Sequence, residues 1–182
     1  MRLDLAALAP ALAYTALLTT AATYDIVQRR IPNWTVLGLL VLFIPTTWLG
    51  YTPTTWPWSI AAFCVALAGS GALYLMGMIG AGDAKLFSAT SLFAGLSNLL
   101  LLFVATTLVG GALALGMLIL RPKSAMRALT KRGRGENGKR GVPYGVAIAA
   151  GAMIAGYITH FAAPHYYLEH LSLPTKLAVV HP

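Results

Sequence analysis

Long apolar runs, separated by short polar stretches, make up most of this chain of 182 residues. A helix needs roughly 20 mainly apolar residues to cross a bilayer, and several of these runs approach or reach that length. The boundaries between the runs predict six helices, at about residues 5–24, 34–49, 59–79, 85–94, 99–120 and 142–160. We therefore expect an all-α fold, a polytopic membrane protein with about six transmembrane helices.

Two of these boundaries need an argument. The first run has Asp4 beside Arg2 and lacks a strongly basic start, so we interpret it as a transmembrane helix and not as a cleaved signal peptide. The run at 86–120 is too long for one comfortable span, and we expect it to divide at 95–98. The stretch at 51–58, with its tryptophans and prolines, is typical of the membrane–water interface.

The composition supports a membrane protein. The chain is 58% hydrophobic and 10% charged, whereas soluble domains have roughly 25% charged residues. We therefore expect a single membrane domain over residues 1–182, with membrane lipids as partners. The net charge of +8 is explained by basic cytoplasmic loops, so no nucleic-acid partner is predicted. Cys64 is the only cysteine, which excludes a disulfide framework and a zinc site built from cysteines.

Eight basic residues gather between 121 and 140, together with the acidic Glu136. We interpret 121–141 as a basic cytoplasmic loop that touches anionic lipid headgroups, with substrate docking as the alternative. Six helices would place eleven basic residues on one side of the membrane and two on the other, which predicts that the first side is cytoplasmic. The aromatic, amphipathic tail at 161–182 is expected to lie at the membrane interface.

The chain has five acidic residues, and only Asp25 and Asp83 fall near one membrane surface in this arrangement. Ionisable groups at such a depth are costly and usually functional. Two neighbouring carboxylates share a proton, so one acts as a base toward water and the other as an acid toward a scissile carbonyl. This predicts an aspartic peptidase with no metal and no cofactor. The four histidines lie on the predicted outer side, which argues against a metal centre.

These polar residues also have purely structural interpretations. Asp25 can end a helix and pair with Arg29, four positions on. Asp83 can cap the helix that follows it, and Lys85 can extend to lipid headgroups instead of influencing Asp83. Two other functions therefore stay open: a transporter whose two aspartates relay protons, and a non-catalytic membrane subunit in which the glycine turn at 80–85 only packs helices.

Three short motifs occur in order along the chain: Asp25 with Ile31-Pro32-Asn33, then Gly80-Ala81-Gly82-Asp83-Ala84-Lys85, then Val142-Pro143-Tyr144-Gly145. Together they resemble the type IV prepilin peptidases, polytopic aspartic proteases with a Gly-x-Gly-Asp signature that presenilin-type proteases share. The resemblance implies that Asp25 and Asp83 are the catalytic pair. The other motif residues that we expect to bind substrate or support the site are Gly80, Gly82, Lys85, Pro143, Tyr144 and Gly145.

The chain departs from the larger members of that family in two respects. Those members have a cytoplasmic insertion with zinc-binding cysteines and also methylate the new N-terminus, and this chain lacks the cysteines and the insertion. Val146 also replaces a proline that many of them have. The chain is therefore similar to the short, peptidase-only members that serve tight-adherence (Flp) pilus systems. The resemblance implies pilus biogenesis and secretion as the process. It also implies prepilin or pseudopilin substrates with a basic leader, and a bacterial inner-membrane location with the site at the cytoplasmic face.

Overall fold

The computed structural model describes residues 5–48, 55–120 and 144–158, and every regular element in these ranges is helical. The all-α prediction is therefore confirmed for this part of the chain. The predicted basic loop at 121–141, the tail at 161–182 and Pro143 lie outside the described residues. The helices are α1 (Leu5–Gln28), α2 (Asn33–Trp48), α3 (Trp56–Leu75), α4 (Ala81–Leu120) and α6 (Tyr144–Gly156).

Within the described residues, α3 and α4 are each long and apolar enough to cross a membrane. The other two apolar helices singled out by composition are shorter, with 16 residues in α2 and 13 in α6. The described part of the chain thus contains helices that could cross a membrane, whereas the number of six transmembrane helices stays a prediction.

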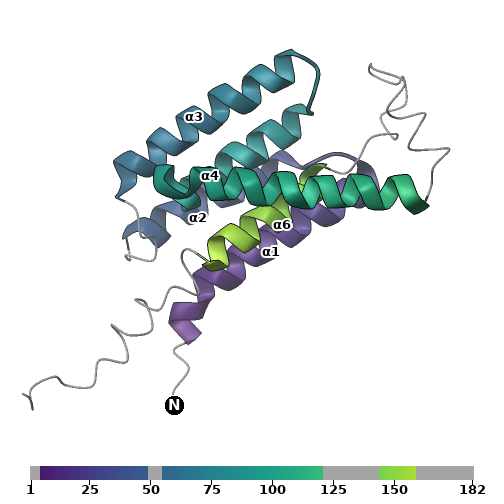
Figure 1. Ribbon diagram of the computed structural model, residues 1–182. Helices are drawn as coiled ribbons and strands as arrows, with labels where there is room; N and C mark the ends of the chain where they lie inside the picture. Colours follow the sequence, from purple (N-terminus) through teal and green to yellow (C-terminus); the bar gives the residue numbers. More distant parts are fainter. Residues whose placement is uncertain (1–4, 49–54, 121–143, 159–182) are drawn as a thin grey trace, which may run out of the picture.

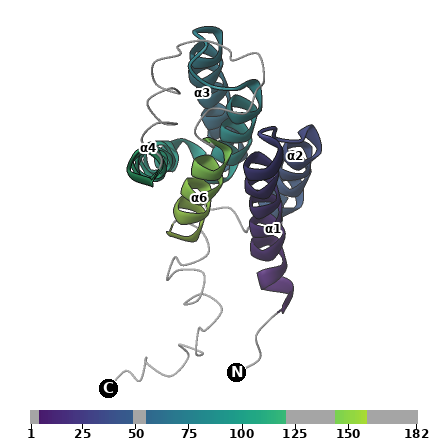
Figure 2. The ribbon, with the colours of Figure 1, turned by 90° about the vertical axis from the view of Figure 1, so that its right-hand side faces the viewer.

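The helix α6 lies in the middle of the bundle, between α1 and α4 (Figures 1 and 2). The helix α3 packs on α4, and α2 packs beside α1 and α4. Aromatic rings join three of these helices, because the ring of Phe93 lies 4.7 Å from that of Tyr14 and 5.6 Å from that of Phe43, measured between centroids. The buried core therefore forms where α1, α2 and the first part of α4 meet, and α6 completes it with Ile148, Ala149, Ala152 and Ala155.

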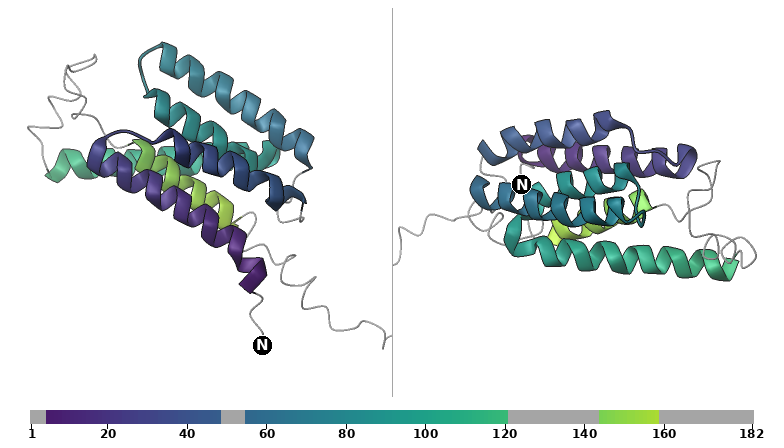
Figure 3. Two further views of the ribbon diagram at one scale, coloured as in Figure 1. Left: turned by 180° about the vertical axis from the view of Figure 1, so that it is seen from behind. Right: turned by 90° about the horizontal axis from the view of Figure 1, so that it is seen from above.

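A sharp reversal divides α4 at Gly95. This residue has φ 67° and ψ 172°, a conformation that is essentially restricted to glycine. The chain turns back on itself there, so both ends of α4 lie at the same end of the molecule (Figures 1 and 3). The predicted division of the long apolar run at 95–98 is confirmed. We call the parts before and after Gly95 the first and second segments of α4.

Two predicted helix ends close to the candidate site are wrong. The first helix does not stop near residue 24 but continues to Gln28, so Asp25 lies within its last turn. Its end is marked by Arg29, whose φ of 54° is left-handed and whose amide donates to the Asp25 carbonyl at 3.0 Å. The predicted glycine turn at 80–85 is also shorter than expected, because α4 already begins at Ala81.

The ends of α3 also differ from the prediction, which was 59–79. The helix begins earlier, at Trp56, because Pro57 suits the first turn, where its missing N–H is not needed. It ends earlier, at Leu75, and the chain then passes through Gly77 with φ 72°. The predicted start and end of α2 are within one residue of the observed Asn33–Trp48.

The helices α4 and α6 touch backbone to backbone at Gly151. A methyl group added there would lie 2.6 Å from the N and Cα atoms of Thr106. Such a contact requires the two helices to move apart, and overpacking of this kind destabilises proteins by roughly 1–3 kcal/mol. We therefore expect Gly151→Ala to lower the unfolding temperature of the detergent-solubilised protein. Gly116→Ala is the control, because a methyl group there meets no atom within 4 Å. Equal unfolding temperatures for the two variants would contradict this interpretation.

Candidate active site

Asp25 lies in the last turn of α1 and its side chain points to the start of α6. The residue is buried, with 7% of its surface exposed. Its Oδ2 atom accepts a hydrogen bond from the Val146 amide at 3.3 Å, and the Gly145 amide interacts with the same carboxylate. Amides in the first turn of a helix have no partners within the helix, so they are free to hold a carboxylate. The first turn of α6 therefore orients Asp25.

Asp83 lies in the first turn of α4. Its Oδ2 atom accepts a hydrogen bond from the Gly80 amide at 3.2 Å, just before the helix begins. The Ala84 amide in turn donates a hydrogen bond to the Gly80 carbonyl at 3.1 Å. Gly80 is thus the N-cap residue, and Asp83 makes the side-chain half of a capping box. The capping interpretation of Asp83 is confirmed, and it explains why the helix starts at Ala81.

Ile31 connects the two acid-bearing parts of the chain. A methyl group added at Gly82, next to Asp83, would lie 3.2 Å from Ile31 Cβ. A methyl group added at Gly145, beside Asp25, would lie 2.9 Å from Ile31 Cδ1. One isoleucine side chain therefore packs against a glycine from each of the other two motifs.

Ile31 was quoted as part of a motif, but its role in joining the motifs was not predicted. The sequence offered no signal that singles it out, because the same stretch also contains Ile26 and Val27, and both of these are exposed.

A second contact joins the motif that contains Ile31 and Asn33 to the motif that contains Gly82 and Lys85. Lys85 Nζ donates a hydrogen bond to Asn33 Oδ1 at 3.4 Å. Lys85 lies on α4 and Asn33 is the first residue of α2, so the bond ties the start of one helix to the start of the other. Lys85 is exposed, so extension toward lipid headgroups and this contact with Asn33 are both compatible with its position.

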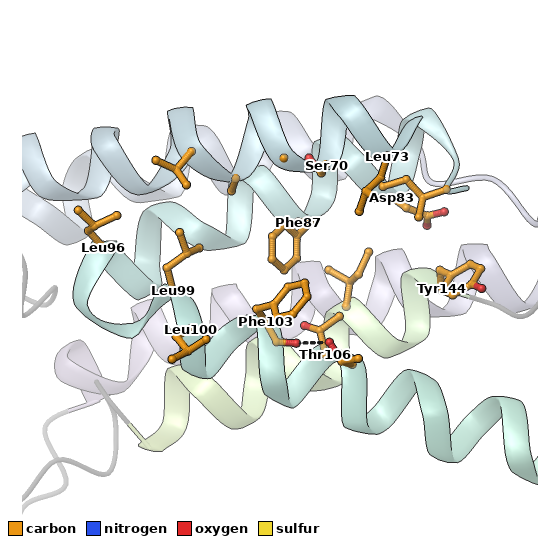
Figure 4. Close-up of a pocket in the computed structure, with 16 residues that line it drawn as sticks. Ser70, Leu73, Asp83, Phe87, Leu96, Leu99, Leu100, Phe103, Thr106 and Tyr144 are labelled. Carbon is orange, nitrogen blue, oxygen red and sulfur yellow. Dashed lines mark hydrogen bonds between the residues drawn. The ribbon is translucent and has the colours of Figure 1, made fainter. Parts of the chain in front are cut away.

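The structure brings most of the predicted site residues to one end of the bundle. The like charge of Asp25 disfavours the ionised form of Asp83, whereas the opposite charge of Arg29 favours the ionised form of Asp25. Gly82 and Gly145 lie on either side of Ile31, and Tyr144, which is partly exposed, begins α6 at the same end as Asp83 (Figure 4).

A cavity of about 700 Å³ extends from this end along the bundle, with Asp83 and Tyr144 in its wall (Figure 4). Its other walls come from α3, Ile79 in the connection between α3 and α4, both segments of α4, and Ile148 of α6. Asp25 is not among the residues that line it. The two carboxylates are thus unequal, since Asp83 faces the cavity and Asp25 is held by the α6 amides.

No group of three or more His, Cys, Asp or Glu side chains suited to a metal ion occurs within residues 5–48, 55–120 and 144–158. The four histidines of the chain lie outside these ranges. The absence of a metal thus stays a prediction.

Comparison with known proteins identifies the family. Residues 12–115 match the type IV leader peptidase family, and this match covers more than half of the chain. It includes Asp25 and Asp83 but ends before the third motif, which begins at residue 142. No curated protein and no solved structure matches the chain. The resemblance carried by the three motifs is confirmed, and the chain belongs to the type IV leader peptidase family.

Proposed function

We propose that this protein is an aspartic endopeptidase of the membrane that removes the leader from prepilins, with Asp25 and Asp83 as its catalytic pair. Membership in the leader peptidase family supports a peptidase acting on prepilin-type substrates. The observation that carries the choice of residues is the packing of Ile31 against both Gly82 and Gly145. Ile31 belongs to the motif of Asp25, so this packing joins that motif to the motif of Asp83 through Gly82 and to the third motif through Gly145, which supports a mechanism with two cooperating carboxylates.

The proposed reaction needs only these two groups and a water molecule. One carboxylate takes a proton from the water molecule while the oxygen of that water attacks the scissile carbonyl carbon. The protonated carboxyl group donates a hydrogen bond to the carbonyl oxygen, and a proton then passes to the amide nitrogen that leaves. The amides around Asp25 and the Gly80 amide at Asp83 support this role, because they restrict the carboxylates to fixed orientations before the substrate binds.

The direct test is a cleavage assay with the purified protein in detergent. A prepilin from the same genome should lose its leader, as measured by the mass of the product. Membrane topology does not affect this assay, so it separates a peptidase from a proton-coupled transporter or a packing subunit. An intact prepilin after prolonged incubation with folded enzyme would exclude the proposal.

We expect the enzyme to cleave without methylating its product. The lone Cys64 and the missing insertion support this expectation, because the larger, bifunctional members have a cysteine-rich zinc site there. Mass spectrometry of pilin processed in the presence of S-adenosylmethionine should find an unmodified N-terminus. A product heavier by one methyl group would contradict this prediction.

The proposed topology places the site at the cytoplasmic face of the inner membrane. It is supported by the basic residues of 121–140, which would lie on the same side as Asp25 and Asp83. A reporter inserted between residues 133 and 138 should therefore report a cytoplasmic position, and one at the C-terminus an external position. A C-terminal reporter in the cytoplasm would overturn the six-helix arrangement.

A further inference from the structure

Arg29 follows the last residue of α1 in a backbone conformation that arginine rarely adopts. Its φ of 54° is left-handed, and no other residue except glycine has a positive φ in the part of the chain that the structure describes. Glycine usually occupies this position after a helix, because a side chain is disfavoured there. A strained residue next to a candidate catalytic group suggests that its side chain has a use.

The side chain of Arg29 is less exposed than its neighbours. Arg29 is partly buried, whereas Gln28 before it and Arg30 after it are exposed. The bond from its amide to the Asp25 carbonyl keeps the residue next to Asp25. The position of Arg29 therefore explains why its positive charge acts on the Asp25 carboxylate.

Several groups oppose the effect of burial at Asp25. Burial raises the pKa of the Asp25 carboxyl group, because a charge is poorly solvated inside a protein. The amides of Val146 and Gly145 and the charge of Arg29 lower this pKa, because they stabilise the carboxylate. Asp25 thus has two amides from α6 and one cation to support a negative charge.

Asp83 has less support for a negative charge. Within the described ranges, one amide, that of Gly80, donates to its carboxylate. The start of α4 favours a carboxylate, but the start of α6 does the same for Asp25 with two amides. The like charge of Asp25 also disfavours a charge on Asp83. Asp83 lines the cavity (Figure 4), so a proton on it is accessible from there.

The other ionisable groups around Asp25 come from each of the elements near it. Arg30 is exposed, and the exposed Lys85 of α4 donates to Asn33. The helix α2 has no ionisable side chain. The remaining groups are the phenols of Tyr24, beside Asp25 on α1, and Tyr144, at the start of α6. Arg29 is thus the cation that acts on Asp25, and Asp83 is the acid that competes with it for a proton.

We propose that Arg29 is a positioning residue that keeps Asp25 ionised as the general base, while Asp83 holds the proton and acts as the general acid. This assignment rests on the proposed peptidase function. It deepens that function, because it gives each aspartate one role and gives a third residue the task of keeping the roles apart.

The assignment gives every proton a path. Asp25 takes a proton from water while the water oxygen bonds to the scissile carbonyl carbon, and Asp83 gives its proton to the carbonyl oxygen. When the carbon–nitrogen bond of the resulting diol breaks, Asp25 gives its proton to the leaving nitrogen. Asp83 takes a proton back from one hydroxyl group of the diol. Both aspartates return to their starting states, and one water molecule is consumed.

Four variants separate the charge of Arg29 from its backbone conformation. Arg29→Asn removes the charge, and asparagine accepts a left-handed φ. Arg29→Gly removes the charge and also relieves the backbone strain. Arg29→Lys keeps the charge. Arg30→Asn is the matched control, because it removes the same charge from the exposed neighbouring residue.

The first measurement is the pH dependence of kcat/KM for prepilin cleavage, together with the unfolding temperature of each variant. Loss of the cation raises the pKa of the Asp25 carboxyl group, so the acidic limb should move to higher pH in Arg29→Asn and Arg29→Gly. We expect a loss of about threefold or more on that limb and an unchanged basic limb. Arg29→Lys and Arg30→Asn should keep the wild-type profile, and Arg29→Gly should unfold at the same or a higher temperature.

The second measurement does not depend on cleavage. Infrared spectroscopy detects the C=O band of a protonated carboxyl group in the purified protein near neutral pH. We expect the wild type to show this band and Asp83→Asn to lose it, because the proton belongs to Asp83.

Three outcomes would overturn the assignment. A wild-type acidic limb in Arg29→Asn and Arg29→Gly would remove the role of Arg29. A loss that is equal at every pH and is not restored in Arg29→Lys would show that Arg29 only supports the structure. A protonated carboxyl band that persists in Asp83→Asn would place the proton on Asp25. Failure of the folded wild-type enzyme to cleave prepilin would instead refute the proposed function itself.

Discussion

Replacement of either Asp25 or Asp83 by asparagine is expected to abolish the cleavage of prepilin while the protein stays folded in the membrane. Asparagine has nearly the shape of aspartate, but it cannot exchange the proton that the proposed mechanism moves. Loss of a general acid or base lowers rates by roughly 10²–10⁴-fold. Because the two roles depend on each other, the double variant should be little worse than either single variant. The measurement is the initial cleavage rate at equal amounts of folded enzyme.

The control for these variants is Glu136→Gln, which removes a carboxylate from the basic segment at 121–140. It should leave the cleavage rate close to that of the wild type. The capping bond from the Gly80 amide to Asp83 can also be made by an asparagine oxygen, so a folded Asp83→Asn protein is expected. Substantial cleavage by either aspartate variant would remove the aspartic mechanism and favour a transporter or a packing subunit.

A single methyl group at Gly145 is expected to lower kcat by about a hundredfold with little change in KM. The added carbon in Gly145→Ala would lie 2.9 Å from both Asp25 Oδ2 and Ile31 Cδ1, and 3.0 Å from Asp25 Cβ. Asp25 is held between this glycine and its own helix, so it must move, and displacement of a catalytic group by about 1 Å is enough for a loss of that size. Steady-state kinetics with full-length prepilin would measure both constants.

Gly111→Ala is the matched control for Gly145→Ala, because a methyl group at Gly111 meets no atom within 4 Å. It should retain the wild-type kcat. Adding Ile31→Val to Gly145→Ala removes the Cδ1 contact but not the contacts with Asp25, so recovery should be partial. A kcat of Gly145→Ala within twofold of the wild type would show that the position of Asp25 does not depend on this glycine.

The helices of this protein could be predicted from the sequence because apolar runs and their polar interruptions are local features. The division of the long run near residue 95 was predicted for the same reason, and Gly95 provides the conformation that it needs. The end of α1 was misplaced because it is marked by Arg29 with a positive φ, and the usual signal for such an end is glycine. The start of α4 was misplaced because Asp83, which was assigned to the glycine turn, caps the helix from within its first turn by accepting a hydrogen bond from the Gly80 amide.

The candidate site was predicted only in part. The three motifs could be assigned to one end of the bundle, and the described residues of all three do meet there. Their contacts could not be predicted, because the packing of Ile31 between Gly82 and Gly145 joins residues far apart in the sequence. The cavity beside Asp83 was missed for a similar reason. It is formed by faces of α3, α4 and α6 that become neighbours only when α4 turns back.

The reversal of α4 at Gly95 also has a consequence for how the protein enters the membrane. Both ends of α4 lie at the same end of the molecule, and the turn itself, from Ala94 to Asn98, has no charged residue. If both segments span the membrane, as the proposed six-helix topology has it, they form a helical hairpin that can insert from the side of synthesis as one unit. No charged loop has to pass through the hydrocarbon core, which is the expensive step for an ionisable side chain. Under the same proposed topology, Asp83 and Lys85 would remain on the side where the chain was made.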